Sequence, residues 1–284
     1  MIKKILLSTA VIALFLPQIK AQDSTKQPKQ KTLTMTRIER AESKYKDLFG
    51  QQITASKTDP ELMNILQRFI FGEVFYAGTL DDRTRELITI TALTVNQTLP
   101  QLKSHANAAL NVGVKPIEIR ESIYQLAPFI GFPKVLNAVE TINSVFESRG
   151  IKLPLENTAT ITEENRLQKG KEMQVPLYGD GMKTAMKDLP GGFNTIIPDM
   201  LTESLFADFY TRDGLDIKTR ELLIFCALAS LGGTERQMAS HALGNLKTGN
   251  SKETLIAAMV QCYPYIGFPR ISNAINILKD VKPD

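Results

Sequence analysis

The chain has 284 residues, of which 43% are hydrophobic and 23% charged, and these proportions are typical of a folded globular protein rather than a disordered or collagen-like one. Such a length holds one large domain or two ordinary ones. All 30 Asp and Glu residues and all but three of the 34 Lys and Arg residues follow residue 21, so the chain beyond this point is nearly neutral. A nucleic-acid-binding surface needs clustered basic residues, and we therefore expect no nucleic acid partner.

The beginning of the chain has the layout of a secretory signal peptide. Lys3 and Lys4 precede a mainly apolar run at residues 5–16, and Ala21 is a small residue at a suitable cleavage point. This run is too short to cross a membrane as a helix. We predict that residues 1–21 are removed on export to the periplasm or the cell exterior, rather than retained as an anchor, and that the mature protein makes no membrane contact.

An internal repeat divides the rest of the chain. Residues 83–87, Arg-Thr-Arg-Glu-Leu, return at 218–222 as Lys-Thr-Arg-Glu-Leu. Residues 128–133, Pro-Phe-Ile-Gly-Phe-Pro, return at 264–269 with Tyr in place of the first Phe. A repeat spacing this long indicates duplicated domains rather than a solenoid. We place domain one at residues 32–150 and domain two at residues 160–282.

The first predicted helix of each repeat motif is a buried one. Asp81 and Asp216 are suitable N-caps, because a short side-chain acceptor satisfies free backbone N–H groups at the start of a helix. The segments that follow, residues 86–95 and 221–231, are apolar on nearly all sides. A helix without a polar face is buried on most of its surface, so we expect these two helices in the core.

Further helices are expected after each buried one. In domain one, the second helix opens near Thr98 and stops at Gly113. The third begins at Pro116 and reaches Pro128, where a proline kinks or breaks a helix, and the last starts near Pro133. No segment shows the period-two alternation of a strand, so the predicted fold class is all-α.

Two Glu and His pairs are the strongest candidates for chemistry. His105 and His241 are the only histidines, and they occupy the same place in the repeat. Glu86 and Glu221 lie in the preceding helix, and antiparallel neighbouring helices can bring such residues together. A Glu–His pair is suited to proton transfer near neutral pH. The alternative is structural: core histidines, with each Glu paired to a base such as Arg85 or Arg220.

Other sequence signals of a reactive centre are weak. Cys226 and Cys262 lie in apolar segments and are expected to be buried free thiols rather than a disulfide. Two histidines without a cysteine cluster do not make a zinc site, and no phosphate-binding or dinucleotide-binding motif occurs. We therefore expect neither a metal nor a cofactor.

The two Gly-Phe-Pro turns have two readings. Gly131 and Pro133 in domain one, and Gly267 and Pro269 in domain two, could line a substrate pocket through their backbone. They could equally be helix breaks with a packed Phe. Spacing alone does not decide between these readings.

In combination, the residues of both repeats resemble the carboxymuconolactone decarboxylase family, whose superfamily includes the alkylhydroperoxidase D proteins. The residues that carry the resemblance in repeat one are Leu80, Asp81, Arg83, Arg85, Glu86, Leu87, His105, Ala109, Gly113, Glu118, Ile119, Gly131, Pro133, Asn137 and Ala138. Those in repeat two are Leu215, Arg220, Glu221, His241, Gly267 and Pro269. The resemblance implies two tandem all-helical domains, a homo-oligomer, a small-molecule substrate and sites near subunit or domain interfaces.

The chain departs from the alkylhydroperoxidase D pattern, which has a Cys-x-x-Cys-x-x-x-His motif. The residues seven and four positions before each His are Thr98 and Gln101, and Thr234 and Gln237. Thiol peroxidase chemistry needs a thiolate nucleophile and a resolving thiol. We therefore expect no peroxidase activity of that type.

The resemblance implies a decarboxylase of small carboxylated lactones or related acids. His105 and His241 would be the general acids, Glu86 and Glu221 would orient them, and Arg85 and Arg220 would be candidate anion anchors. The alternatives are a thiol-dependent antioxidant of the same superfamily and a non-catalytic ligand-binding or assembly protein. Because the usual decarboxylase pathway is intracellular, predicted export points to a different substrate for this chain.

Overall fold

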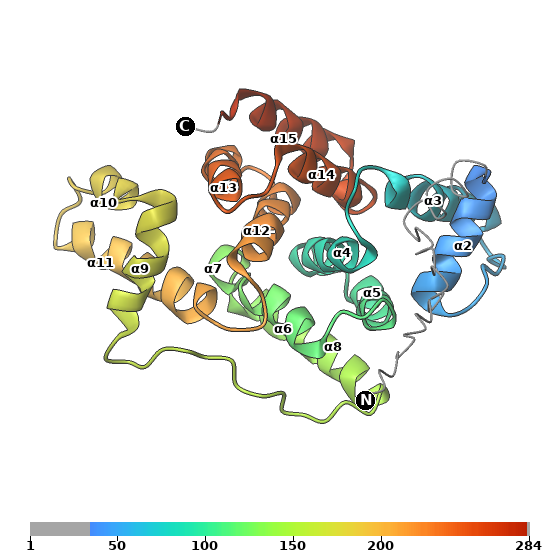
Figure 1. Ribbon diagram of the computed structural model, residues 1–284, viewed down its shortest axis with the longest axis horizontal. Helices are drawn as coiled ribbons and strands as arrows, with labels where there is room; N and C mark the ends of the chain where they lie inside the picture. The colour runs from blue at the N-terminus through green and yellow to red at the C-terminus, as the bar shows by residue number, and fades with distance from the viewer. Residues whose placement is uncertain (1–34, 283–284) are drawn as a thin grey trace, which may run out of the picture. The chain divides into compact units, whose positions relative to one another are not determined.

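The computed structural model describes residues 35–282, and the regular elements assigned to these residues are all helical (Figure 1). The all-α prediction is thus confirmed. The predicted signal peptide lies outside the described residues. Among the helices that are described, none is both long and apolar enough to cross a membrane. From Thr36 onward the chain forms one compact unit, and the boundaries of domains one and two stay predictions.

The four helices predicted in repeat one begin close to the predicted positions, although the third ends at Tyr124 and not at Pro128, and further helices precede them. The helices of repeat one are α2 (Arg37–Phe49), α3 (Pro60–Gly72), the short 3-10 helix η1 (Val74–Tyr76), α4 (Asp82–Asn96), α5 (Leu99–Asn111), α6 (Pro116–Tyr124), α7 (Ala127–Ile130) and α8 (Phe132–Ser148). α4 starts at the predicted cap, where the carboxylate of Asp81 accepts a hydrogen bond from the amide of Thr84 at 2.8 Å.

The helices of repeat two follow the same order with local differences. They are α9 (Arg166–Tyr178), α10 (Gly181–Ala185), α11 (Phe193–Leu201), the π-helical η2 (Thr202–Tyr210), α12 (Ile217–Leu231), α13 (Glu235–Lys247), α14 (Lys252–Ile266) and α15 (Phe268–Asp280). Asp216 caps α12 as predicted, accepting from the amide of Thr219 at 2.7 Å. Pro264 lies inside α14, whereas repeat one breaks between α6 and α7.

The two repeats also correspond outside the sequence motifs. α2 and α9 each have 13 residues and end just before a glycine with positive φ, Gly50 or Gly179. Near the start of these helices, an ion pair between Arg37 and Glu73 has its counterpart in one between Arg166 and Asp208.

Contacts between aromatic rings show the same correspondence between the repeats. In repeat one, the ring of Phe71 contacts the rings of both Phe49 and Phe75. In repeat two, the ring of Phe206 contacts those of Tyr178 and Tyr210 in the same order. Phe49 therefore corresponds to Tyr178, and Phe75 to Tyr210.

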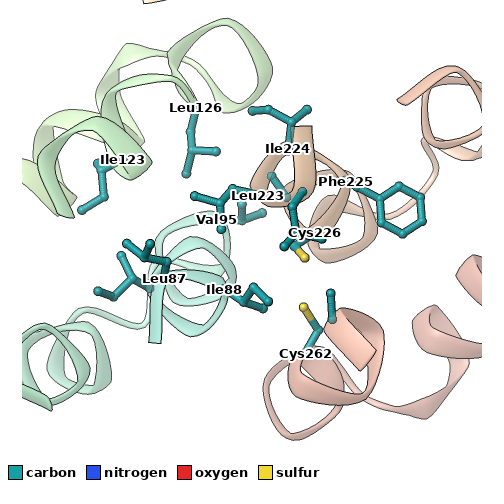
Figure 2. Close-up of a cluster of buried hydrophobic side chains, with 14 of the residues drawn as sticks. Leu87, Ile88, Val95, Ile123, Leu126, Leu223, Ile224, Phe225, Cys226 and Cys262 are labelled. Atoms are coloured by element: carbon teal, nitrogen blue, oxygen red, sulfur yellow. The ribbon is translucent and has the colours of Figure 1, made fainter. Parts of the chain in front are cut away.

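The core is shared between the repeats rather than divided between them. α4 packs against α12, and α14 packs against both of them. Leu87 and Ile88 of α4 belong to the same buried cluster as Leu223 of α12 (Figure 2). Cys226 and Cys262 lie in this cluster as free buried thiols, with their sulfur atoms directed toward each other. Burial raises the pKa of Cys226 well above its usual value, and the neighbouring Cys262 adds to this effect.

The segment that joins the repeats is fastened at a buried charge cluster. The carboxylate of Glu121, which is fully buried, accepts hydrogen bonds from Arg120, Arg212 and the hydroxyl of Thr158 at 2.9–3.0 Å. Arg220 adds a longer contact of 3.4 Å. Burial alone would raise the pKa of Glu121, but the hydrogen bonds and charges of Arg212, Thr158 and Arg220 outweigh burial and lower it.

Candidate functional site

In repeat one, α4 and α5 bring the predicted Glu and His into direct contact. Glu86 is fully buried, and His105 is 7% exposed. The Nδ1 atom of His105 lies 2.8 Å from Oε2 of Glu86. The other carboxylate oxygen, Oε1, is buried and has no hydrogen-bond partner among residues 35–282. The pair is thus formed, but half of the buried carboxylate is left unsatisfied.

In repeat two, α12 and α13 form the corresponding pair with two additional hydroxyl groups. Nδ1 of His241 lies 3.0 Å from Oε2 of Glu221. Tyr178 donates to the same oxygen at 2.6 Å, and its hydroxyl oxygen also lies 2.8 Å from Nδ1 of His241. Tyr210 donates to Oε1 of Glu221 at 2.8 Å. Both oxygens of this buried carboxylate are therefore satisfied.

The difference between the pairs follows from the aromatic residues beside them. Phe49 and Phe75 stand where repeat two has Tyr178 and Tyr210, and phenylalanine has no hydroxyl to donate. Burial and the charge of Glu221 raise the pKa of both tyrosines. Both tyrosines consequently stay protonated, as hydrogen-bond donors to Glu221, throughout the physiological pH range.

Each histidine is also contacted by an aromatic ring from the other repeat. The ring of Tyr265 lies edge-on to His105 with 5.6 Å between the ring centres. The ring of Phe129 lies edge-on to His241 at 5.7 Å. Phe129 and Tyr265 are equivalent positions of the repeat, so the exchange is reciprocal. Neither histidine site is complete without the other repeat.

The Gly-Phe-Pro turns act through these aromatic residues. Gly131 and Gly267 have φ of 82° and 80° and end the preceding helices, a conformation that favours glycine. Pro133 and Pro269 lie in the first turns of α8 and α15. None of these four residues lines the two cavities described below. The turns therefore act as helix breaks. Each one positions the aromatic residue that lies two places before its glycine.

A cavity of about 580 Å³ opens at the histidine of repeat two. Its walls come from α9, α10, α11, η2 and α13, with Phe129 from repeat one. The lining residues are Phe129, Gln174, Tyr178, Gly181, Met182, Ala185, Met186, Leu201, Leu205, Phe206, Arg236, Gln237, Ser240 and His241. Because Nδ1 of His241 is held by Glu221 and Tyr178, Nε2 is the ring nitrogen left for a ligand. A largely apolar cavity with a few polar groups is typical of a small-molecule site.

The two predicted anion anchors are engaged elsewhere. Arg85 is fully buried and donates to Gln261 and to backbone carbonyl groups of the 74–80 segment. Arg220 is also fully buried, and it contacts Gln125, Glu121 and the carbonyl of residue 212. Neither arginine bonds to Glu86 or Glu221. Their guanidinium groups instead join the two repeats, so the geometry does not support an anchoring role or a pairing with the candidate glutamates.

Arg236 is the cation that the cavity does present. It lies in the first turn of α13, and its side chain is exposed. Its guanidinium group makes no hydrogen bond or ion pair within residues 35–282. In repeat one the corresponding position is Pro100, in the first turn of α5. Among the described residues that line the two cavities, Arg236 is the cation without an ion pair, since Arg212 is paired with Glu121.

Sequence reasoning did not identify the aromatic residues of the two sites. Tyr178 and Tyr210 belong to no recognisable motif. Phe129 and Tyr265 lie in the repeated segment that contains the Gly-Phe-Pro turns, but that segment does not indicate which histidine each ring contacts. An alignment of residues 37–50 with 166–179 would have paired Phe49 with Tyr178. The contact of each ring with the opposite histidine depends on how the repeats pack, and no local pattern reports it. Within the described part of the chain, no group of three or more His, Cys, Asp or Glu residues could hold a metal.

Comparison with known proteins agrees with this architecture. The model of the carboxymuconolactone decarboxylase family matches twice, at residues 60–143 and 197–280. The chain is 41% identical over 78 residues to an uncharacterised 15.0 kDa protein of Paracoccus denitrificans, over 27% of this chain and 58% of that protein. It is 32% identical over 91 residues to the 4-carboxymuconolactone decarboxylase of Acinetobacter baylyi, over 32% of this chain and 68% of that enzyme.

A third relative is the nitrosuccinic acid decarboxylase of Metarhizium robertsii, 28% identical over 94 residues, over 32% of this chain and 66% of that enzyme. The chain thus spans less than two thirds of the first of these relatives. The crystal structure of a proposed gamma-carboxymuconolactone decarboxylase subunit from Burkholderia xenovorans has a TM-score of 0.50 at 19% identity, over 86% of this chain and 95% of that one. This likeness supports the fold. With two matches that together cover more than half of its length, the chain belongs to the carboxymuconolactone decarboxylase family.

Proposed function

We propose that the protein is a carboxy-lyase that removes CO₂ from a small carboxylated lactone or related acid in the cavity at His241. The observation that carries this proposal is the Glu221–His241 pair. The carboxylate is fully buried, Nδ1 of the histidine is occupied, and the imidazole lines a cavity of small-molecule size. Two of the relatives are named as decarboxylases of small acids.

The proposed step is a proton transfer coupled to loss of CO₂. The bond between the carboxylate carbon and the substrate breaks, CO₂ leaves, and the electron pair passes to a conjugated carbonyl as an enolate. Protonated His241 then delivers the proton on Nε2 to the substrate carbon, as a general acid. Glu221 stabilises the imidazolium before the transfer, and His241 is reprotonated from solvent afterwards.

The tyrosines support this role by donating hydrogen bonds to the buried carboxylate of Glu221. A carboxylate without solvent is strongly disfavoured unless hydrogen bonds replace the lost water. Tyr178 and Tyr210 supply these bonds to both oxygens of Glu221. In repeat one, Glu86 lacks them, and this contrast leads us to assign the main activity to repeat two.

Arg236 takes the anchoring role that the buried arginines cannot fill. A decarboxylase substrate is anionic, and the cavity presents one unpaired guanidinium in its wall. The cavity lining contains no Asp or Glu side chain within the described residues. We assign Arg236 to the binding of a substrate carboxylate, an interaction that arginine makes with well-defined geometry.

The positions of the cysteines argue against a thiol-dependent antioxidant. The positions that would hold the dithiol contain Thr98 and Gln101 in repeat one, and Thr234 and Gln237 in repeat two. Burial raises the pKa of Cys226, and a thiolate rather than a thiol is the nucleophile in such chemistry.

Export and homo-oligomerisation remain part of the proposal. Export is motivated by the first 21 residues, and its test is N-terminal sequencing of the protein recovered from the periplasm or medium. Intact residues 1–21 there, or a purely cytoplasmic location, would contradict it. Homo-oligomerisation is motivated by family membership. Light scattering on the purified protein, as it elutes from a sizing column, measures the mass of the assembly directly.

The decisive experiment is decarboxylation of 4-carboxymuconolactone followed by ultraviolet absorbance. Wild-type protein should decarboxylate this lactone or one of a set of related small carboxylated acids assayed beside it. A double variant with His105→Ala and His241→Ala should not, with circular dichroism showing that it is folded. Turnover that is unchanged in the double variant would refute the acid assignment. Folded wild-type protein that turns over neither this lactone nor related small acids would refute the lyase proposal and leave a binding or assembly role.

A further inference from the structure

A second cavity, of about 620 Å³, lies on the repeat-one helices and is separate from the His241 cavity. It is bounded by α6, α7, α8, η2 and the joining segment at residues 159–163. The lining residues are Tyr124, Ala127, Pro128, Phe132, Val135, Leu136, Val139, Ala159, Ile161, Thr162, Glu163, Ser204, Asp208, Phe209 and Arg212. The lining is mainly apolar, and neither His105 nor His241 belongs to it.

The internal repeat shows what fills the equivalent place on the other half of the molecule. Ala127 corresponds to Tyr263, because the Pro-Phe-Ile-Gly-Phe-Pro segment begins at the next residue in both repeats. Ser204 corresponds to Phe69, through the paired residues Glu73 and Asp208 of the matching ion pairs. Two large aromatic side chains therefore stand where this cavity has only a methyl group and a hydroxymethyl group.

The two aromatic side chains pack against each other in the filled half. The ring of Phe69 meets that of Tyr263 edge-on, with centres 5.0 Å apart. Tyr263 also contacts Phe268 at 5.6 Å, and Phe268 corresponds to Phe132 of the cavity. The filled half thus shows which groups fit this place in the fold: two aromatic rings in edge-on contact, beside a phenylalanine.

The cavity also retains the surfaces that such a ring would contact. Phe132 and Leu136, each 63% exposed, present apolar surface at its edge. Ser204 lines the cavity and is partly exposed, so its hydroxyl can bond to a ligand hydroxyl. Two of the charged side chains in the wall are already paired, Arg212 with Glu121 and Asp208 with Arg166. The third, Glu163, is exposed to solvent, so the wall offers no unpaired cation to an anionic ligand.

We propose that this cavity is a binding site for a small uncharged aromatic molecule, of the phenol class, whose ring takes the place that Phe69 and Tyr263 occupy in the other half. The inference is independent of the proposed decarboxylation, because it rests on residues that do not touch the His241 cavity. Aromatic rings in contact prefer edge-on or offset arrangements, and the open half offers Phe132 and Phe209 for such contacts.

The test uses p-cresol, the side-chain analogue of tyrosine, with cyclohexanol as a non-aromatic control of similar size. Isothermal titration calorimetry of the purified protein should show p-cresol binding at least tenfold more tightly than cyclohexanol. The variant that combines Ala127→Tyr with Ser204→Phe rebuilds the aromatic pair of the other half. It should weaken p-cresol binding at least tenfold. Because its new rings have a native template in the same chain, we expect it to fold.

A matched control separates the two cavities. Ala185→Phe narrows the His241 cavity and should leave p-cresol binding unchanged. The single variant Ala127→Ser keeps the second cavity open and should also bind p-cresol like the wild type. Equal binding of p-cresol and cyclohexanol, loss of binding in Ala185→Phe, or full binding by the filled variant would overturn the proposal. A change of oligomeric mass in the filled variant would also overturn it, since the cavity would then hold a second copy of the chain.

Discussion

The two histidine sites of this chain have the same backbone and different chemistry. Both hold a buried carboxylate against a histidine, at 2.8 Å in repeat one and 3.0 Å in repeat two. Glu221 is bonded through both oxygens to tyrosine hydroxyls, whereas Glu86 has one buried oxygen without a partner. The duplicated fold of this chain therefore keeps the position of the Glu–His pair in both repeats, but not the hydroxyl groups that bond to the carboxylate.

The largest expected effect concerns Glu121, a charge that only one half of the molecule contains, since Ala257 stands at the corresponding position. Glu121→Gln removes the charge that three arginines face in the interior. Leaving buried cations unpaired typically costs about 3–5 kcal/mol, and urea unfolding should show a loss of this order. Ala257→Ser, a small change at the equivalent position of the other half, is the control and should change the free energy of unfolding much less. A loss below about 1 kcal/mol in Glu121→Gln would mean that the cluster does not stabilise the fold.

The charge of Glu121 should also make the free energy of unfolding depend on pH. The folded pKa of Glu121 is lowered, so its contribution to stability is complete above the unfolded value, about 4.3, and is lost as pH falls through the folded value. The free energy of unfolding of the wild type should therefore exceed that of Glu121→Gln most above about pH 5, with the gap narrowing in acid. A gap that widened on acidification would have the wrong sign.

The second comparison replaces each histidine separately. We expect His241→Ala to lower decarboxylation by about 10²-fold or more, the usual range for loss of a general acid. His105→Ala should reduce it far less, because its carboxylate lacks the tyrosine donors. Steady-state rates of both variants decide the matter. Equal losses would show that the two repeats work together, and a larger loss in His105→Ala would reverse our assignment.

The third comparison exchanges the aromatic partners. Tyr178→Phe gives repeat two the repeat-one residue and removes a hydrogen bond to a charged group, a loss of about 1.5–3 kcal/mol. It should lower both the free energy of unfolding and kcat, with KM changed less. Phe49→Tyr makes the reciprocal exchange and should not lower stability by a similar amount. If Tyr178→Phe left kcat intact, the tyrosine would have only a structural role.

The smallest expected effect is on substrate binding. Arg236→Gln should raise KM about tenfold with little change in kcat, and Arg236→Lys should recover part of the loss, because a cation is restored without the planar guanidinium. Lys103→Gln, an exposed charge change on α5 of repeat one, is the control for net charge. A similar rise in KM for Lys103→Gln would point to a general electrostatic effect instead of an anchor.

The extent to which the sequence predicts this molecule follows from the range of each interaction. The caps at Asp81 and Asp216, the buried helices after them and the Glu–His spacing are local, so pattern and repeat identify them. Arg85 shows where such reasoning stops. Beside Glu86 in sequence, it was a reasonable partner or anchor, but the packing of the repeats turns it toward Gln261 and backbone carbonyls. Tyr178 and Phe129 depend on contacts between segments distant in the chain, which no single segment encodes.

The reciprocal placement of Phe129 and Tyr265 has a consequence for how such a chain can evolve. In a symmetric pair of separate single-repeat subunits, one codon would specify both rings, and any substitution would appear in both sites at once. Covalent fusion removes this constraint, because each position is now encoded separately. One half can drift, fill its spaces or open new ones, while the other half still receives the aromatic ring that its histidine requires. Selection can then act on two different pockets within a single gene product.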